Sequence, residues 1–399
     1  MSTLNKYHTL FSNHKTPFYF YDTGLLKNTL DEIKKASSPY NYHVHYALKA
    51  NTNDALLKII KDAGLGADCV SGNEVKKAIE LNFGADKIVF AGVGKSDDEI
   101  NYALQQNIFC FNCESIPEIE VINELAKQQN KIALVALRIN PNVDAQTHKY
   151  ITTGLEENKF GINPHELTEV LEILKNCKCL KLIGLHFHIG SQITDLNTFK
   201  NLCTRVNEIQ HWFQQRGYHI EHINVGGGLG INYSKPDEES VCNFEAFFSL
   251  FKKFLQVQAH QQIHFELGRA VVAQCGSLIS RVLYIKKGTN TNFAILDAGM
   301  TELIRPALYQ AYHKIENVSA IQHSPVILSL SKGNTQPFKY DVVGPICESS
   351  DCFGKAVELP ETQRGDIIAI RSAGAYGEVM SSQYNLRDKV KSYFDTENL

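Results

Sequence analysis

The chain has 399 residues, of which 43% are hydrophobic and 21% are charged, and its formal net charge is −3. This length predicts two domains, and this composition is that of an ordinary globular protein. The small net charge gives no reason to expect nucleic acid or a membrane surface as a partner. No apolar run approaches the length of a membrane span, and the first residues lack the apolar core of a signal peptide. We therefore expect a cytoplasmic location.

Residues 24–270 alternate strand-like apolar runs with amphipathic, helix-like stretches. The strand-like runs are 43–48, 66–70, 87–91, 108–112, 132–138, 183–188, 222–226 and 263–266. The helix-like stretches are 24–36, 53–63, 72–82, 97–106, 116–128, 164–176, 195–216 and 244–260. Eight strands alternating with helices predict a (β/α)8 barrel, with a doubly wound open sheet as the alternative, because alternation does not distinguish a closed sheet from an open one.

The first predicted strand ends in a lysine, Lys49. Lysine is depleted in strands, and in an apolar pocket its amine shifts toward the neutral form. A neutral amine is a nucleophile that forms a Schiff base with a carbonyl cofactor, most commonly pyridoxal phosphate (PLP). The alternative interpretation is a strand-end lysine that reaches solvent.

Other polar residues and glycines also follow the predicted strands, where a barrel places its functional groups. They are Asp68, Arg138, His188 with Ser191, the glycines Gly226, Gly227 and Gly228, and Glu266 with Gly268 and Arg269. Four glycines in the five positions 226–230 favour a phosphate-binding loop over an ordinary tight turn.

Glu266 and His188 each allow two interpretations. A carboxylate at the end of a buried strand needs a cationic partner, which could be a protonated pyridine nitrogen or, locally, Arg269. His188 shares the inward face of its strand with His186, so its ring could stack on a flat cofactor or be a satisfied core histidine.

After Arg269 the pattern changes to short strands at 276–287, 292–297, 325–330, 339–343 and 366–371, punctuated by Gly and Pro. This pattern predicts a mostly β second domain, and residues 18–21 form an extra strand that could join either domain. We therefore predict a barrel domain over 23–270 and a β-rich domain over 1–22 and 271–399. Cys110 and Cys113 match a C-x-x-C pattern without a second ligand pair, so we expect reduced thiols and no metal site.

Taken together, the motifs resemble the diaminopimelate decarboxylase family, within the group IV PLP-dependent decarboxylases of the alanine-racemase-like fold type. The resemblance covers nearly the whole chain and rests on the runs 46–51, 66–74, 186–192, 305–309 and 344–351 and on the glycine loop. One departure is Leu267, where many relatives have proline.

The resemblance implies a role for each motif residue. Lys49 would hold PLP covalently, and Cys347 would be the proton donor. The other cofactor-binding residues would be Asp68, His188, Ser191, Gly227, Gly228, Glu266, Gly268, Arg269 and Tyr376. The substrate-binding residues would be Arg269, Arg305, Tyr309, Glu348 and Tyr376. Cys347 and Glu348 would come from the partner subunit of a homodimer with shared active sites.

The implied reaction is the decarboxylation of meso-2,6-diaminopimelate to L-lysine and CO2, the last step of lysine biosynthesis by the diaminopimelate route. A decarboxylase of basic amino acids would instead place an acidic residue where this chain has Arg305. A catalytically inactive homologue would have lost Lys49, Cys347 or the glycine loop, and this chain retains all three.

Overall fold

The computed structural model describes residues 3–143, 159–319 and 338–395, and the chain divides into two compact units. The barrel unit comprises Lys27–Gly230 and Cys242–Val271. The β-rich unit comprises Met1–Leu26, Ile231–Val241 and Val272–Leu399. Among the described residues, no helix combines the length and the apolar character needed to cross a membrane.

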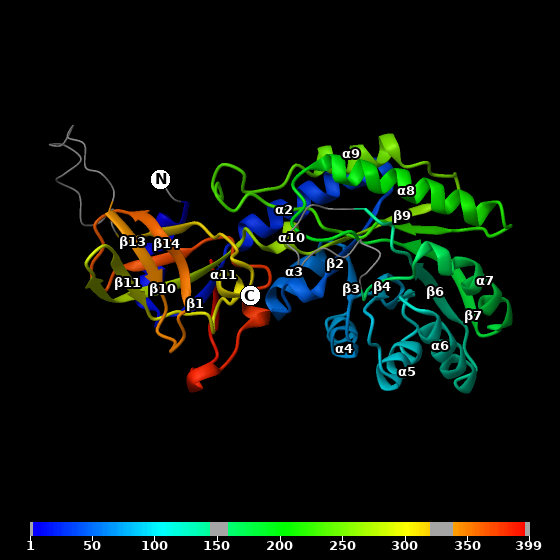
Figure 1. Ribbon diagram of the computed structural model, residues 1–399, viewed down its shortest axis with the longest axis horizontal. Coiled ribbons are helices and arrows are strands. Elements are labelled where there is room, and N and C mark those ends of the chain that lie inside the picture. The colour runs from blue at the N-terminus through cyan, green and yellow to red at the C-terminus, as the bar shows by residue number, and fades with distance from the viewer. Residues whose placement is uncertain (1–2, 144–158, 320–337, 396–399) are drawn as a thin grey trace. The chain divides into compact units, whose positions relative to one another are not determined.

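The barrel unit is built on a closed ring of parallel strands (Figure 1). In order around the ring these are β2 (His43–Ala47), β3 (Gly66–Cys69), β4 (Ile88–Phe90), β5 (Cys110–Cys113), β6 (Ala133–Arg138), β7 (Leu180–His186), β8 (His222–Asn224) and β9 (Gln262–Leu267). Pairing of β9 with β2 closes the ring, with Glu266 opposite His45. The (β/α)8 barrel is confirmed, and the open sheet is excluded.

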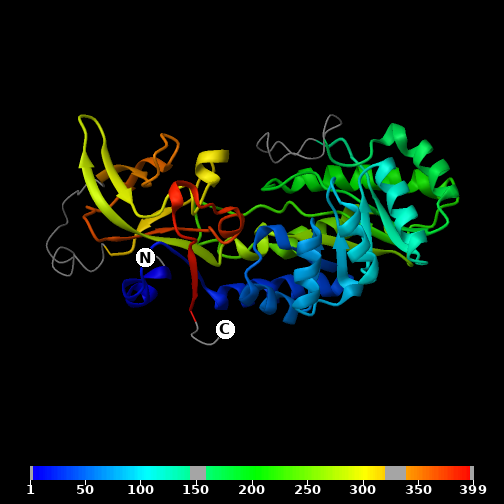
Figure 2. The same ribbon diagram turned by 90° about the horizontal axis from the view of Figure 1, so that it is seen from below.

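Helices lie outside this ring of strands (Figures 1 and 2). They are α2 (Thr23–Ser37), α3 (Asp54–Asp62), α4 (Gly72–Glu80), α5 (Asp97–Gln105), α6 (Ile116–Gln128), α7 (Leu167–Asn176), α8 (Leu196–Gln214), α9 (Phe244–Phe254) and the single turn α10 (Arg269–Val272). Several begin at a capping side chain; Ser96 and Glu99, for example, form a capping box that satisfies the free amides of α5. The α9 helix ends six residues before the predicted residue 260, at Phe254.

The strands of the barrel are buried on both faces, as parallel strands covered by helices usually are. Inside the ring, however, several buried positions carry polar side chains. They are His45, Asp68, Asn112, His186, Asn224, His264 and Glu266. Because a buried polar group requires a partner, these residues mark where the barrel departs from an ordinary apolar core.

The β-rich unit contains a sheet in the order β12-β15-β10-β11-β13-β14, with β1 paired to β10 and β16 paired to β1. The strands are β1 (Phe18–Tyr21), β10 (Gly276–Lys287), β11 (Asn292–Leu296), β12 (Ile315–Asn317), β13 (Phe338–Val343), β14 (Cys352–Leu359), β15 (Ile367–Ile370) and β16 (Lys391–Phe394). The long hairpin of β10 and β11 stands out in yellow-green in Figure 2. The extra strand at 18–21 therefore joins the β-rich unit. The strand predicted at 325–330 lies outside the described residues.

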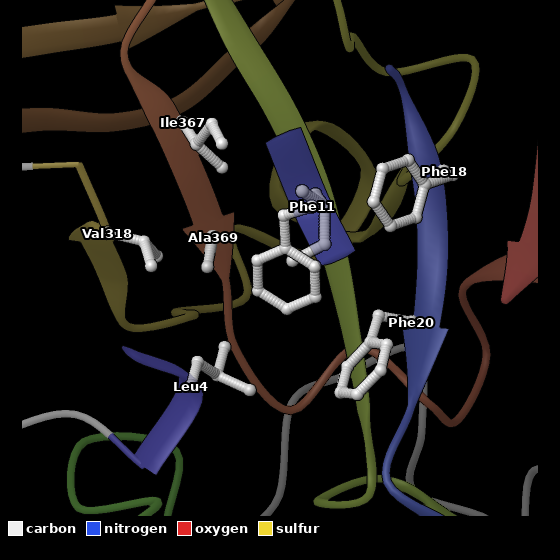
Figure 3. Packing of buried hydrophobic residues seen from close by; sticks show 8 residues of the cluster. Leu4, Phe11, Phe18, Phe20, Val318, Ile367 and Ala369 are labelled. Atoms are coloured by element: carbon white, nitrogen blue, oxygen red, sulfur yellow. The ribbon is translucent and has the colours of Figure 1, made fainter. Parts of the chain in front are cut away.

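The short helical segments of the β-rich unit are η1 (Thr3–Tyr7), α1 (His8–Asn13), α11 (Arg305–Tyr309), η7 (Glu378–Met380) and η8 (Tyr384–Leu386). One core cluster of this unit joins the N-terminal segment to the sheet, with Phe11, Phe18 and Phe20 packed on Ile367 and Ala369 (Figure 3). Each fully buried phenylalanine contributes about 2 kcal/mol of hydrophobic stabilisation, so the N-terminal segment is part of this core rather than a loose tail.

Candidate active site

Lys49 lies in a short turn, η3 (Leu48–Ala50), directly after β2 rather than within the strand. Its Nζ is 3.1 Å from Asp68 Oδ2, and the Lys49 side chain is 38% exposed whereas that of Asp68 is 0% exposed. The other carboxylate oxygen, Asp68 Oδ1, is buried without a hydrogen-bond partner among the described residues. Burial and the nearby Glu266 raise the pKa of Asp68, while Lys49 opposes this shift. The structure thus places an accessible amine beside a buried carboxylate that has room for a further donor.

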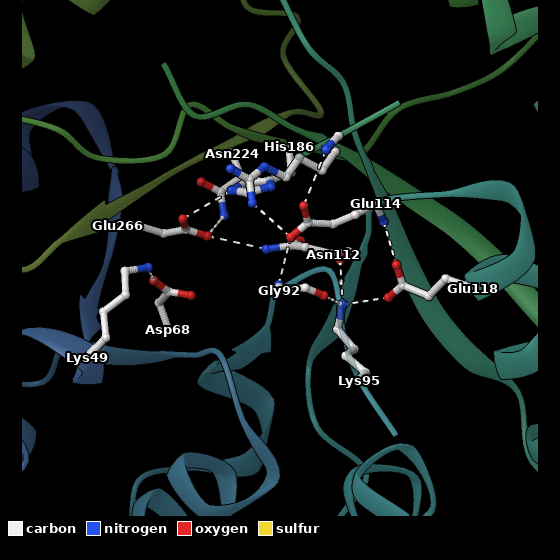
Figure 4. A network of polar contacts seen from close by, with 12 residues as sticks. Lys49, Asp68, Gly92, Lys95, Asn112, Glu114, Glu118, His186, Asn224 and Glu266 are labelled. Atoms are coloured by element: carbon white, nitrogen blue, oxygen red, sulfur yellow. Dashed lines mark hydrogen bonds and ion pairs between the residues drawn. The ribbon is translucent and has the colours of Figure 1, made fainter. Parts of the chain in front are cut away.

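The carboxylate of Glu266, on β9, is held by three side chains from three other strands (Figure 4). Oε1 accepts hydrogen bonds from Asn224 Nδ2 at 2.8 Å and Asn112 Nδ2 at 3.3 Å, and Oε2 is 3.0 Å from His186 Nε2. Burial alone would raise the pKa of Glu266, but His186 and Lys49 hold it far below its usual range. Glu266 is therefore ionised, and His186, Asn112 and Asn224 are among the side chains that hold its carboxylate.

The glycine loop follows β8 and could not be built from other residues. Gly226 and Gly228 have φ values of 70° and 102°, which glycine adopts without strain. A Cβ on Gly227 would lie 1.7 Å from the carbonyl oxygen of Glu266, so no side chain fits there. The loop therefore presents bare backbone at the rim of the barrel.

His188 lies two residues beyond the end of β7 and is half-buried. The N–H of Gly227 donates to His188 Nδ1 at 3.3 Å. Burial and the nearby cations Arg138 and Lys49 lower the pKa of His188 well below its usual value, so the ring is neutral. A neutral imidazole fixed against the glycine loop is suited to contact a flat aromatic group.

Arg269 begins α10, two residues after β9, and its Nη2 donates to Ser191 Oγ at 2.9 Å. The structure thus brings a guanidinium and a hydroxyl together from two different loops. Both groups can donate to an anion, and arginine matches the geometry of phosphate oxygens.

A second buried network of polar side chains supports the hydrogen bonds around the Glu266 carboxylate (Figure 4). The Lys95 side chain is 1% exposed, and its Nζ donates to Glu118 Oε1 and to the backbone carbonyl of Asn112, the latter at 3.0 Å. Arg138, at the end of β6, donates from Nη1 to Glu114 Oε1 at 2.8 Å. These ion pairs fix the strand that carries Asn112, and through it the position of Glu266.

Asn112 and Asn224 were not predicted as site residues. Each is a polar amide inside an otherwise apolar run, and that is the only signal the sequence carries for them. His186 was placed on the inward face, but its partner could not be identified from the sequence.

The remaining predicted site residues belong to the β-rich unit. Arg305 and Tyr309 are the two ends of α11. Arg305 is buried, and its guanidinium carbon is 5.3 Å from the centroid of the Tyr233 ring. Tyr376, in the run Gly374-Ala-Tyr-Gly377, has a φ of 56°. A tyrosine in this left-handed conformation is uncommon, and such strain is typical of functional loops.

Cys347 and Glu348 lie in an exposed turn between β13 and β14. The backbone N–H of Cys347 donates to Asn385 Oδ1 at 3.2 Å, and Glu348 Oε1 accepts a 2.8 Å hydrogen bond from the hydroxyl of Tyr384. The turn that carries the thiol and the carboxylate is therefore held by residues of η8.

The groups in the barrel unit match the chemical parts of PLP. Lys49 offers an amine for an aldehyde, ionised Glu266 offers an anion for a protonated ring nitrogen, and His188 offers a flat ring. The glycine loop, Ser191 and Arg269 offer backbone and side-chain donors for a phosphate. The buried Asp68 Oδ1 without a partner, and the closeness of Gly227 to Glu266, fit a site shaped for a bound group.

One half-buried acid near this site, Glu74, is expected to make the stability of the protein depend on pH. Glu74 on α4 accepts the Val70 N–H at 2.7 Å, and burial raises its pKa from 4.5 to about 7. The folded state thus binds this proton more tightly than the unfolded state, so stability is lost as the pH rises from about 4.5 to about 7.

We expect Glu74→Gln to remove this loss, because the amide has no charge and its oxygen can still accept the Val70 N–H. Relative to wild type, the variant should gain about 2 kcal/mol of stability between about pH 5 and about pH 8. Thermal unfolding midpoints across this range measure the gain. Glu80→Gln, at an exposed position of the same helix, should give a constant difference. If the stability difference between Glu74→Gln and wild type were also independent of pH, the raised pKa of Glu74 would be contradicted.

Residues 24–273 match the family model described as the pyridoxal binding domain of pyridoxal-dependent decarboxylases. A diaminopimelate decarboxylase from Bacteroides thetaiotaomicron is 57% identical over 395 residues, which cover 99% of this chain and 98% of the relative. The crystal structure of the Helicobacter pylori diaminopimelate decarboxylase complexed with L-lysine is 40% identical, with a TM-score of 0.88 over 98% of this chain and 94% of that one.

A more distant structure, the arginine decarboxylase of Paramecium bursaria Chlorella virus, is 21% identical with a TM-score of 0.82 and shares the fold. The family model covers more than half of the chain, and the curated relatives match it over nearly its whole length. The chain therefore belongs to the pyridoxal-dependent decarboxylases and, among them, to the diaminopimelate decarboxylase family.

Proposed function

We propose that the chain is a carboxy-lyase that converts meso-2,6-diaminopimelate to L-lysine and CO2 with PLP as its cofactor, as the last step of lysine biosynthesis by the diaminopimelate route. The observation that carries this proposal is the ionised Glu266, held by Asn112, Asn224 and His186 at the same rim as the amine of Lys49. A decarboxylase needs a place for the electron pair that CO2 leaves behind. When bound, PLP supplies that electron sink in its protonated ring.

The residues of the barrel unit hold the cofactor in this proposal. Lys49 binds it covalently, and Asp68 orients the amine. Glu266 would keep a proton on the ring nitrogen of the cofactor, because the low pKa of this carboxyl keeps it charged. His188 would lie against the cofactor ring. The phosphate is held by Ser191, Gly227, Gly228, Gly268 and Arg269.

The residues of the β-rich unit recognise the substrate. Arg305 binds the distal carboxylate, with Tyr309 beside it, and Arg269 contributes a second cation. Glu348 binds the distal amino group, and Tyr376 contacts both cofactor and substrate. A substrate without the distal carboxylate would lose its contact with the buried Arg305, which lowers the rate for that substrate.

Cys347 donates a proton to the carbon that has lost CO2. We propose that Cys347 and Glu348 act in the partner subunit's site, in a homodimer with shared active sites. The exposure of both side chains on the single chain supports this arrangement. In the same proposal, residues 23–270 bind PLP, and residues 1–22 and 271–399 supply substrate-binding and dimer-interface residues. A cytoplasmic location stays a prediction.

The direct test is an assay of the purified, PLP-loaded protein for CO2 and L-lysine release from meso-diaminopimelate. We expect kcat/KM for L-lysine or L-ornithine to be lower by on the order of 10⁴-fold, because these substrates lack the distal carboxylate. If the protein bound PLP but released CO2 only from lysine or ornithine, it would be a basic amino acid decarboxylase and this proposal would be wrong.

A further inference from the structure

Arg305, the residue proposed to bind the distal carboxylate of the substrate, lies over an aromatic ring. Its guanidinium carbon is 5.3 Å from the centroid of the Tyr233 ring, within the range of a cation–π contact. Arg305 is 5% exposed and begins the short helix α11. Tyr233 belongs to an inserted segment (Ile231–Val241), which lies between two stretches of the barrel unit in the sequence but is part of the β-rich unit. The fold thus brings the two side chains together from distant parts of the chain.

An aromatic ring is a suitable neighbour for a cation that has to bind an anion. The face of the ring attracts the cation, but the ring carries no net charge. Tyr233 therefore holds the guanidinium without cancelling its positive charge, as a carboxylate in the same place would. Arginine binds a carboxylate through a planar fork of N–H donors, so the orientation of this plane decides whether both carboxylate oxygens are reached. Fixing a long side chain before the ligand arrives also reduces the entropy lost on binding.

The ring of Tyr233 is held in turn by His313. The two ring centroids are 5.0 Å apart and the ring planes meet at 75°, which is an edge-to-face arrangement. His313 is 2% exposed, and its Nδ1 lies 2.9 Å from the backbone carbonyl oxygen of Arg371. A carbonyl oxygen only accepts, so Nδ1 donates this hydrogen bond. The imidazole therefore has a fixed orientation, and it limits the tilt of the Tyr233 ring.

The inserted segment that carries Tyr233 is anchored by the side chain of Arg371. Nη2 of Arg371 donates to Asp237 Oδ1 at 2.8 Å, and Nη1 donates to Glu316 Oε2 at 2.7 Å. Asp237 lies in the inserted segment, four positions after Tyr233. Hydrogen bonds between charged groups are stronger than those between neutral groups. Arg371 thus holds His313 through its carbonyl and the inserted segment through its guanidinium, so both supports of the Tyr233 ring depend on one buried residue.

We propose that Tyr233 is a positioning residue for substrate specificity, whose ring fixes the Arg305 guanidinium in the orientation that binds the distal carboxylate. This inference rests on the proposed function, in which Arg305 binds that carboxylate. Tyr233 does not touch the substrate; it acts through Arg305. Its effect is therefore on the affinity for the anionic end of the substrate, and the loss of CO2 at the other end is unaffected.

The test is the steady-state kinetics of the PLP-loaded protein with meso-diaminopimelate. Tyr233→Leu removes the aromatic face and keeps an apolar side chain. We expect its KM to rise about tenfold while kcat changes by less than about twofold, because the lost contact stabilises the bound substrate and its transition state equally. Tyr233→Phe keeps the aromatic face, and its KM should stay within about twofold of the wild-type value.

Tyr284 offers a matched control, because the guanidinium carbon of Arg364 lies 5.0 Å from the centroid of its ring and Tyr284 is 57% exposed. Tyr284→Leu removes the same kind of contact at the surface and should leave KM unchanged. A double-mutant cycle separates positioning from a general structural role. In the background of Arg305→Leu, Tyr233→Leu should raise KM no further, whereas a general loss of structure would add to the effect.

Three results would overturn the inference and leave the reaction assignment intact: a wild-type KM for Tyr233→Leu, equal rises in KM for Tyr233→Leu and Tyr233→Phe, or additive effects in the cycle. If the wild type released no CO2 from meso-diaminopimelate, the proposed function would fail by itself. Calorimetric titration with pimelate, a dicarboxylate without amino groups, would then decide the inference. Binding about tenfold weaker in Tyr233→Leu than in wild type would support it. Equal affinities, or no binding to the wild type, would overturn it.

Discussion

Replacing Lys49 by alanine is expected to abolish the visible absorbance of bound PLP and to lower the rate of decarboxylation by on the order of 10³-fold or more. The variant lacks the amine that binds the cofactor aldehyde. It also leaves the carboxylate of Asp68, which is 0% exposed, without its 3.1 Å cationic partner. Absorbance spectra of the PLP-loaded protein and CO2 release from meso-diaminopimelate measure the two effects.

Two further variants separate nucleophilicity from charge. Lys49→Arg keeps a cation near Asp68 but is not a nucleophile at neutral pH, so it should be as inactive as the alanine variant. Lys58→Ala, at an exposed position on α3, should leave both the spectrum and the rate unchanged. If Lys49→Arg retained wild-type activity, the role of Lys49 would be electrostatic and the covalent role would be refuted.

Mixing the inactive variants Lys49→Ala and Cys347→Ala is expected to restore about a quarter of the wild-type activity. If each site combines the barrel of one chain with the Cys347 turn of the other, a mixed dimer contains one site with both defects and one site with neither. Random exchange makes about half of the dimers mixed, and half of the sites in these dimers are intact. Differently tagged chains, purified through both tags, allow the activity of the mixed dimer to be measured directly.

The matched control pairs Lys49→Ala with Glu266→Gln. Both changes lie in the barrel unit, so each site of the mixed dimer keeps one defect and activity should not return. Failure of the Lys49→Ala and Cys347→Ala pair to recover activity, with mixed dimers demonstrated, would show that the sites are not shared. That result would leave the assignment of the reaction intact.

The barrel strands were predictable because most of them lie in short, largely apolar runs that are buried on both faces. The predicted run 43–48 corresponds to β2 (His43–Ala47), and 132–138 corresponds to β6 (Ala133–Arg138). The β-rich unit was harder to predict. The strand β14 (Cys352–Leu359) contains Gly354 and Lys355 and lacks clear alternation, so its strand character depends on pairing with β13.

The position of Lys49, Glu266 and the glycine loop at one rim was also predictable, because strand ends of a barrel meet there. The partners of Glu266 were not. Asn112, His186 and Asn224 lie on β5, β7 and β8, and their meeting at one carboxylate depends on the register around the closed ring. Sequence periodicity predicts which face of the sheet a side chain lies on. It does not predict the register, that is, which residues of neighbouring strands lie side by side.

The absence of a side chain at Gly227 also determines how close the glycine loop lies to Glu266. The backbone of the glycine loop lies directly against the carbonyl group of Glu266, so this one contact fixes the distance between the loop and the carboxylate. In the proposed site, these two elements hold opposite ends of the same cofactor. Gly227 therefore sets the distance between the glycine loop and Glu266. Any larger residue at position 227 would increase this distance, and the glycine loop and Glu266 could then no longer bind the two ends of the same cofactor.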